Sequence, residues 1–126
     1  MRLALTAVSC LAALGLGACH SGATKAGTSY SYRLTSLKAD LSFPIDKVFD
    51  ASKKAIEELG FTVETANSDA LEGVIVAKGA TNHTRRVRLE RVGPEITHVE
   101  IFVGPTGSTY RSEEILNRIE DRLAAR

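Results

Sequence analysis

The chain has 126 residues, with 16 Lys and Arg against 15 Asp and Glu, so its formal net charge is +1. This length allows one small domain and an N-terminal segment, but no second hydrophobic core. The near-neutral charge argues against a nucleic-acid-binding protein, which would need an excess of basic residues on one face.

The N-terminus has the features of an export signal. Arg2 is followed by an apolar run that continues to Leu16 without a further charge. The run is shorter than the about 20 residues that a helix needs to cross a bilayer, which favours a removable signal peptide over a permanent membrane helix. It ends in Leu16-Gly17-Ala18-Cys19, which resembles the lipobox of bacterial lipoproteins.

The lipobox resemblance implies that residues 1–18 are removed as a signal peptide and that Cys19 becomes a lipidated N-terminus. Two or three acyl chains, at about 0.8 kcal/mol per buried CH₂, would make a stable anchor. The alternative is an ordinary secretory signal that leaves Cys19 unmodified. We expect Cys10, which lacks the preceding aliphatic-small-small pattern, to be discarded with the signal. The domain would then contain no thiol for a disulfide, a metal or nucleophilic chemistry.

The location within the envelope follows from the residue after the cysteine. His20 stands where an Asp would resemble the inner-membrane retention signal of enteric bacteria. We therefore expect the outer membrane, with the domain facing the periplasm.

Residues 19–35 are expected to form the lipidated N-terminus and a flexible tether. From Ser21 to Ser29 the chain consists of Gly, Ala, Ser, Thr and Lys, a composition that buries little apolar surface. Tyr30 and Tyr32 alternate in the phase opposite to that of the strand after them, so we assign them to the end of the tether.

The predicted domain, residues 36–126, opens with a strand and the clearest helix of the chain. Residues 37–43 alternate between apolar and polar, as in a strand with one buried face. From Ile45 to Leu59 apolar positions recur at helical spacing, and Gly60 stands where a left-handed cap is expected. Ser52 lies on the apolar stripe, and we expect its hydroxyl to bond the carbonyl one turn earlier, which makes a catalytic role improbable.

Two pairs of strands are predicted next. Residues 61–65 and 74–77 read as a hairpin, and residues 86–90 and 98–103 as a second one. A turn centred on Pro94 pairs Val87 with Ile101, Leu89 with Val99 and Arg88 with Glu100.

The last predicted element is a helix with Ser112 as its N-cap. Its apolar edge consists of Ile115, Leu116, Ile119 and Leu123. The order of elements predicts an α+β domain in which an antiparallel sheet of four to five strands carries both helices on one face. The predicted core contains Leu41, Val48, Phe49, Ile56, Val63, Val76, Leu89, Ile101, Ile115 and Ile119.

Beyond the lipobox, two stretches carry a wider resemblance. They run from Phe43 through Ala51 to Phe61, and from Val103 through Ser112 to Ile119. With the order of elements, they resemble a family of small bacterial lipoproteins whose domain has no known function. The similarity covers nearly the whole mature chain and implies the same fold. It supplies no catalytic or binding residue that could be transferred.

One metal hypothesis can be formulated from the polar residues. His98 and Glu100 are two apart on a predicted strand and share a face, and His83 could approach from a loop as a third ligand. The alternative is a solvated strand face on which Arg88 pairs with Glu100, and we favour it. We therefore expect no metal and no cofactor.

The densest charge cluster consists of Arg85, Arg86, Arg88 and Arg91. Their guanidinium groups could hold phosphate or carboxylate groups of an anionic lipid or glycan. Neighbouring glutamates would cancel much of this field, so an ordinary solvated face is the alternative.

The sequence therefore predicts a membrane-anchored lipoprotein that serves as a binding or envelope-assembly accessory module. Its expected partners are the membrane and an envelope protein, anionic lipid or glycan. A small periplasmic hydrolytic or metal-dependent enzyme is the alternative function. The two differ in whether the exposed sheet face is flat with an arginine stripe or concave with His83, His98 and Glu100 converging.

Overall fold

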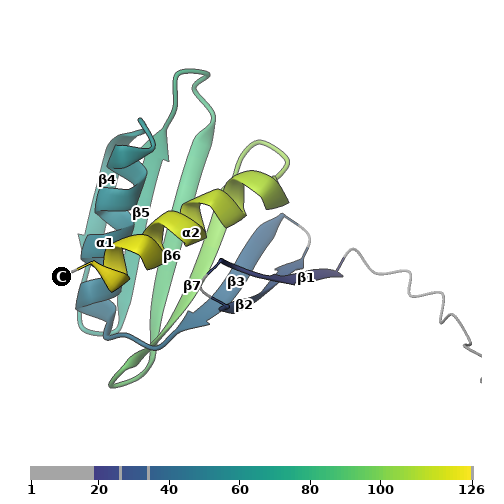
Figure 1. Ribbon diagram of the computed structural model, residues 1–126. Helices are drawn as coiled ribbons and strands as arrows, with labels where there is room; N and C mark the ends of the chain where they lie inside the picture. Colours follow the sequence, from purple (N-terminus) through teal and green to yellow (C-terminus); the bar gives the residue numbers. More distant parts are fainter. Residues whose placement is uncertain (1–18, 26, 34, 126) are drawn as a thin grey trace, which may run out of the picture.

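The computed structural model describes residues 19–125 except residues 26 and 34, so the predicted signal peptide and Cys10 lie outside the described residues. The described residues form seven strands and two helices (Figure 1). The strands are β1 (Cys19–Ala23), β2 (Ser29–Arg33), β3 (Ser36–Leu41), β4 (Thr62–Ser68), β5 (Glu72–Lys78), β6 (Thr84–Gly93) and β7 (Ile96–Val103). The helices are α1 (Ile45–Glu58) and α2 (Thr109–Ala124).

All strands belong to one antiparallel sheet in the order β1-β2-β3-β7-β6-β5-β4. Both helices cover the same face, with α1 over β4, β5 and β6 and α2 over β3 and β7 (Figure 1). The predicted α+β class and the placement of both helices are thus confirmed. The sheet is larger than the four to five strands that the sequence predicted.

The two additional strands come from the segment assigned to a flexible tether, and that assignment is wrong. β1 pairs with β2, and β2 pairs with β3 in a register that places Tyr30 opposite Ala39 and Tyr32 opposite Leu37. Both tyrosines are buried on the helix-bearing side. Arg33 pairs with Ser36, so even-numbered residues of β2 lie opposite odd-numbered residues of β3 and share a face with them. Alternation in the opposite phase is what such a hairpin requires.

The predicted register of the second hairpin is confirmed. In the β6–β7 pair Val87 lies opposite Ile101, Leu89 opposite Val99 and Arg88 opposite Glu100. The apolar partners point to the helices and the charged partners to the other face, because successive side chains of a strand alternate between faces.

The core lies between the sheet and the two helices. Seven of the ten residues predicted for it are buried, namely Leu41, Val48, Ile56, Leu89, Ile101, Ile115 and Ile119. Phe49 and Val63 are partly buried against it. The prediction that Val76 belongs to the core is wrong, because Ile75 and Ala77 face the helices and Val76 faces the open side. The run of apolar residues in this strand fits either phase, so alternation could not select the inner face.

The two helices differ in how well their ends were predicted. α1 is followed by Gly60 with a φ of 87°, and Ser52 donates a hydrogen bond to the carbonyl of Val48 at 2.6 Å, as expected. α2 begins one turn before the predicted N-cap. Its N-cap is Ser108, whose hydroxyl accepts from the amide of Arg111 at 3.3 Å, whereas Ser112 is buried inside the helix.

We expect the face assignment to be visible in stability. Ile101→Ala should lower the free energy of unfolding by about 2 to 5 kcal/mol, because it empties a fully buried site. Val76→Ala, on the open face, should cost well below that range. Urea unfolding of both variants measures this, and similar losses would contradict the assigned phase of β5.

Candidate functional site

The face of the sheet opposite the helices is open, and its side chains form three rows across the strands. The basic row joins Arg33, Ser36, Phe102 and Arg86, which are successive cross-strand partners on β2, β3, β7 and β6. The mixed row joins Lys38, Glu100 and Arg88. The acidic row joins Asp40, His98, Glu90 and Glu72. Charge on the open face therefore changes sign along the strand direction.

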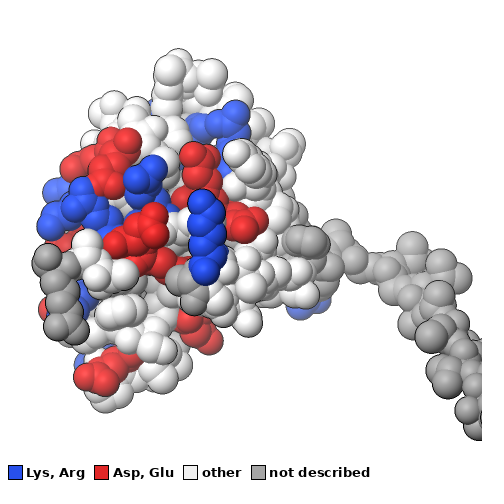
Figure 2. All heavy atoms as spheres, viewed as in Figure 1, with Lys and Arg blue, Asp and Glu red and all other residues white. Residues whose placement is uncertain are grey.

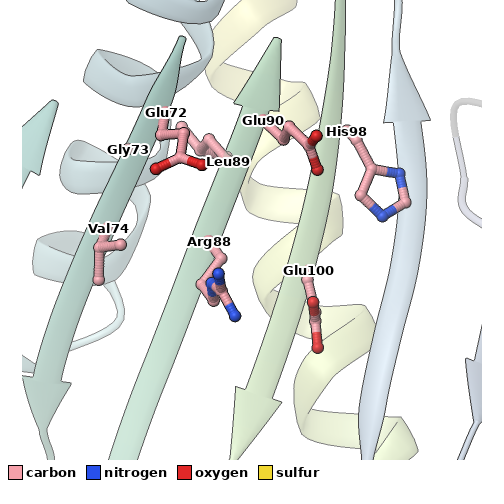
Figure 3. A pocket seen from close by; sticks show the side chains of 8 residues that line it. All are labelled: Glu72, Gly73, Val74, Arg88, Leu89, Glu90, His98 and Glu100. Carbon is pink, nitrogen blue, oxygen red and sulfur yellow. The ribbon is translucent and has the colours of Figure 1, made fainter. Parts of the chain in front are cut away.

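The mixed and acidic rows border a shallow pocket. Arg88 and Glu100 lie side by side on neighbouring strands, with Glu72, Glu90 and His98 further along (Figure 3). The pocket has a volume of about 100 Å³. Small-molecule sites usually measure about 300 to 1,000 Å³, so this pocket is smaller than most sites that enclose a substrate.

His98 is held by the acidic row. Its Nδ1 lies 2.7 Å from Oδ1 of Asp40 on β3, while Glu90 is its register partner on β6. The metal hypothesis needed His98 and Glu100 to converge with His83. His83 instead lies in the β5–β6 connection, at the opposite end of β6 from the residue that pairs with His98. In the part of the chain that the structure describes, no three His, Cys, Asp or Glu side chains are grouped as metal ligands.

The four arginines of the predicted cluster do not form one stripe. Arg86 and Arg88 project from the open face and are exposed. Arg91 is exposed at a bulge in β6, where its Nε donates to the carbonyl of Gly93 at 3.4 Å. Arg85 points to the helix-bearing side and is only 3% exposed. The hypothesis of a single four-arginine site is therefore wrong in its geometry, and Arg86 and Arg88 alone share the open face.

Arg85 occupies an unusual environment for a cation. Its guanidinium carbon lies 4.5 Å from the centre of the Phe61 ring, and its Nη1 donates to the carbonyl of His83 at 2.7 Å. Its buried Nε has no hydrogen-bond partner among the described residues. Burial lowers the pKa of Arg85, and the charge of Arg111 lowers it further. No carboxylate within the described structure forms an ion pair with Arg85.

The helix-bearing side carries charges of a different kind. Figure 2 shows acidic and basic side chains interspersed over it. Glu58 of α1 lies 3.9 Å from Arg118 of α2 and also pairs with Arg122. These opposite charges neutralise one another locally, and no basic or acidic area stands out there.

The N-terminal hairpin is attached to α2 by hydrogen bonds that the sequence analysis missed. Glu120 is only 8% exposed, and its Oε2 accepts from the hydroxyls of Thr24 at 3.0 Å and Thr28 at 3.1 Å. One turn earlier on α2, Asn117 Oδ1 accepts from the amide of Lys25 at 3.1 Å.

Tyr30 extends this attachment along α2. Its hydroxyl donates to Glu113 Oε2 at 2.9 Å. Burial raises the pKa of Tyr30, and the bond to Glu113 adds to the shift, so the phenol stays protonated and remains a donor at neutral pH. Because the hairpin is fixed in this way, Cys19 begins a strand of the sheet, opposite Arg33 of the basic row.

Comparison with known proteins assigns a family. The family model described as "Protein of unknown function (DUF3568)" matches residues 1–122. The chain belongs to this family. No curated protein matches the sequence of this DUF3568 member.

The attachment of the hairpin can be tested on Glu120. Glu120→Ala leaves the two threonine hydroxyls without their acceptor. The free energy needed to open the hairpin should therefore fall by about 1 to 3 kcal/mol. Hydrogen exchange of the β1 and β2 amides should become faster, while β6 and β7 keep their protection. The control is Glu114→Ala, an exposed carboxylate on the same helix. Unchanged exchange in β1 and β2 would contradict the role of Glu120.

The buried position of Arg85 leads to a second prediction, on the stability of the domain. Replacing a buried, unpaired cation with an apolar side chain of similar length relieves desolvation. Arg85→Met should therefore leave the urea midpoint unchanged or raise it. Arg86→Met, next to it on the exposed face, serves as the control. A loss above about 2 kcal/mol in Arg85→Met would mean that the contacts with Phe61 and His83 outweigh the cost of burial.

Proposed function

We propose that this DUF3568 chain is the precursor of a bacterial lipoprotein, anchored through acyl chains on Cys19, whose domain is a binding or envelope-assembly accessory module. The observation that carries the proposal is the position of Cys19. It ends the lipobox-like sequence Leu16-Gly17-Ala18-Cys19 and is also the first residue of β1. Removal of residues 1–18 would leave every described strand and helix intact.

One further observation bears on the anchor. The family model matches from residue 1 onward, so its aligned span includes the apolar segment and Leu16-Gly17-Ala18-Cys19. Neither of the two helices in the described residues has the length and apolar character needed to span a bilayer.

A binding role suits the open face better than catalysis does. The hollows on the described part of this face are shallow: one of about 100 Å³ lies beside Arg88 and Glu100, and a wide-open one of about 380 Å³ lies beside Lys38 and Asp40. In the enzyme hypothesis, His98 and Glu100 line one pocket, but His83 lies in the β5–β6 connection, away from them. The proposed partners are an anionic lipid, a glycan or a protein of the envelope, and the proposed location is the periplasmic side of the outer membrane.

Acylation is tested by labelling cells with a radioactive fatty acid. The wild-type chain should carry label and partition into the detergent phase of Triton X-114. Cys19→Ser should abolish both, because the sulfur that receives the lipid is gone. Cys10→Ser should change neither, since Cys10 would leave with the signal peptide. Label that persists on Cys19→Ser would overturn the proposed anchor.

A further inference from the structure

The basic row lies in line with the proposed anchor. Cys19 is the register partner of Arg33, and the row continues from Arg33 through Ser36 and Phe102 to Arg86. Arg33 and Arg86 are exposed on the open face, and Arg86 lies over the ring of Phe102 at 5.7 Å. The end of the sheet that contains Cys19 is therefore positively charged on its open face.

Two further arginines lie near this end on the helix-bearing side. Arg85 precedes Arg86 in β6, so it lies at the same level on the opposite face. Arg111 belongs to the first turn of α2, where the helix dipole adds partial positive charge. Arg85 is buried and forms no ion pair within the described residues, so it adds positive charge at this end without itself contacting a ligand.

Glu114 is exposed three residues after Arg111 on α2 and offsets part of its charge, whereas the other carboxylates near this end are paired or lie further away. Glu64 lies 3.5 Å from Lys78, and Glu113 accepts a hydrogen bond from Tyr30. Glu57, near the end of α1, is exposed on the side of the sheet that β4 and β5 occupy, away from β1. The acidic row lies two rows further along the strands, towards the opposite end of the sheet.

We propose that the Cys19 end of the sheet, with Arg33 and Arg86 on the open face and Arg111 at the start of α2, rests on the phosphate groups of the bilayer that holds the anchor. This inference rests on the proposed function and names the partner of its basic residues. An anionic phospholipid surface fits them because the anchor would hold them within reach of it, and because the hairpin attachment leaves no tether to turn the domain away. Guanidinium groups match phosphate oxygens in geometry as well as charge.

The inference is tested on residues 19–126 carrying Cys19→Ser, so that no acyl chain contributes. This chain contains every described strand and helix, and circular dichroism checks that it folds. It is sedimented with vesicles of phosphatidylcholine alone or with phosphatidylglycerol. Binding should require phosphatidylglycerol and weaken as salt is raised, since each exposed basic residue near an anionic surface contributes roughly fivefold.

Two double variants with the same change in charge separate the basic row from the rest of the face. Arg33→Glu with Arg86→Glu should weaken binding by at least about tenfold. Arg88→Glu with Arg91→Glu, away from the Cys19 end, should weaken it by no more than about threefold because of screening. Equal weakening by both pairs, binding that ignores phosphatidylglycerol, or a preference for peptidoglycan over vesicles would each overturn the inference.

Orientation is measured on the acylated chain in the same vesicles. A fluorophore on Ser36→Cys, in the basic row, should be quenched by headgroup spin-labelled lipid more strongly than one on Glu72→Cys, in the acidic row. Equal quenching would overturn the inference while leaving the anchor in place. The opposite result is also possible. If the wild-type chain carries no acyl label but the Arg33→Glu, Arg86→Glu variant selectively loses vesicle binding, the anchor is refuted and the phosphate-binding surface stands.

Discussion

The register of the sheet is the constraint on which the other features depend. In the β6–β7 pair, Val87 and Ile101 face the helices only if Arg88 and Glu100 face outwards. A slip of one residue would expose the whole buried set, so packing on the inner face fixes the register strongly. The same register then decides which charges become neighbours on the open face, and it places Cys19 beside the basic row. The arrangement of the outer surface is thus set by burial on the inner one.

A second constraint holds the first two strands to the rest of the domain. Glu113, Asn117 and Glu120 are spaced by four and three residues, so they lie along one side of α2. Each accepts a hydrogen bond from the N-terminal hairpin. A flexible segment of this length would have a root-mean-square span of about 20 to 25 Å and would let the domain turn freely. The polar side of α2 therefore converts a weakly apolar segment into part of the sheet.

Local periodicity explains what the sequence revealed and what it hid. The helix around Ile56 and the pairing of Arg88 with Glu100 follow from patterns within short windows, and both were predicted. The hairpin was missed because its threonines bind Glu120 across 92 and 96 residues of sequence, a separation that no local pattern reports. The prediction grouped Arg85 with the exposed arginines, although the alternation of β6 already indicated that it faces inwards. It shares the parity of Val87 and Leu89, which alone would have assigned it to the inner face.

The spacing of the rows explains how a chain with a net charge of only +1 could present a basic surface to a membrane. Adjacent rows lie two residues apart along the strands, so the acidic row lies about 13 Å from the basic row. The Debye length at physiological ionic strength is about 8 Å, which screens exposed charges beyond that distance. A bilayer at the Cys19 end would therefore interact with Arg33 and Arg86 much more strongly than with Glu72 or Glu90. The net charge sums the charges at both ends of the sheet. The proposed anchor would bring only the Cys19 end to the membrane. It can do so because the hairpin holds Cys19 in a fixed position relative to the rest of the sheet.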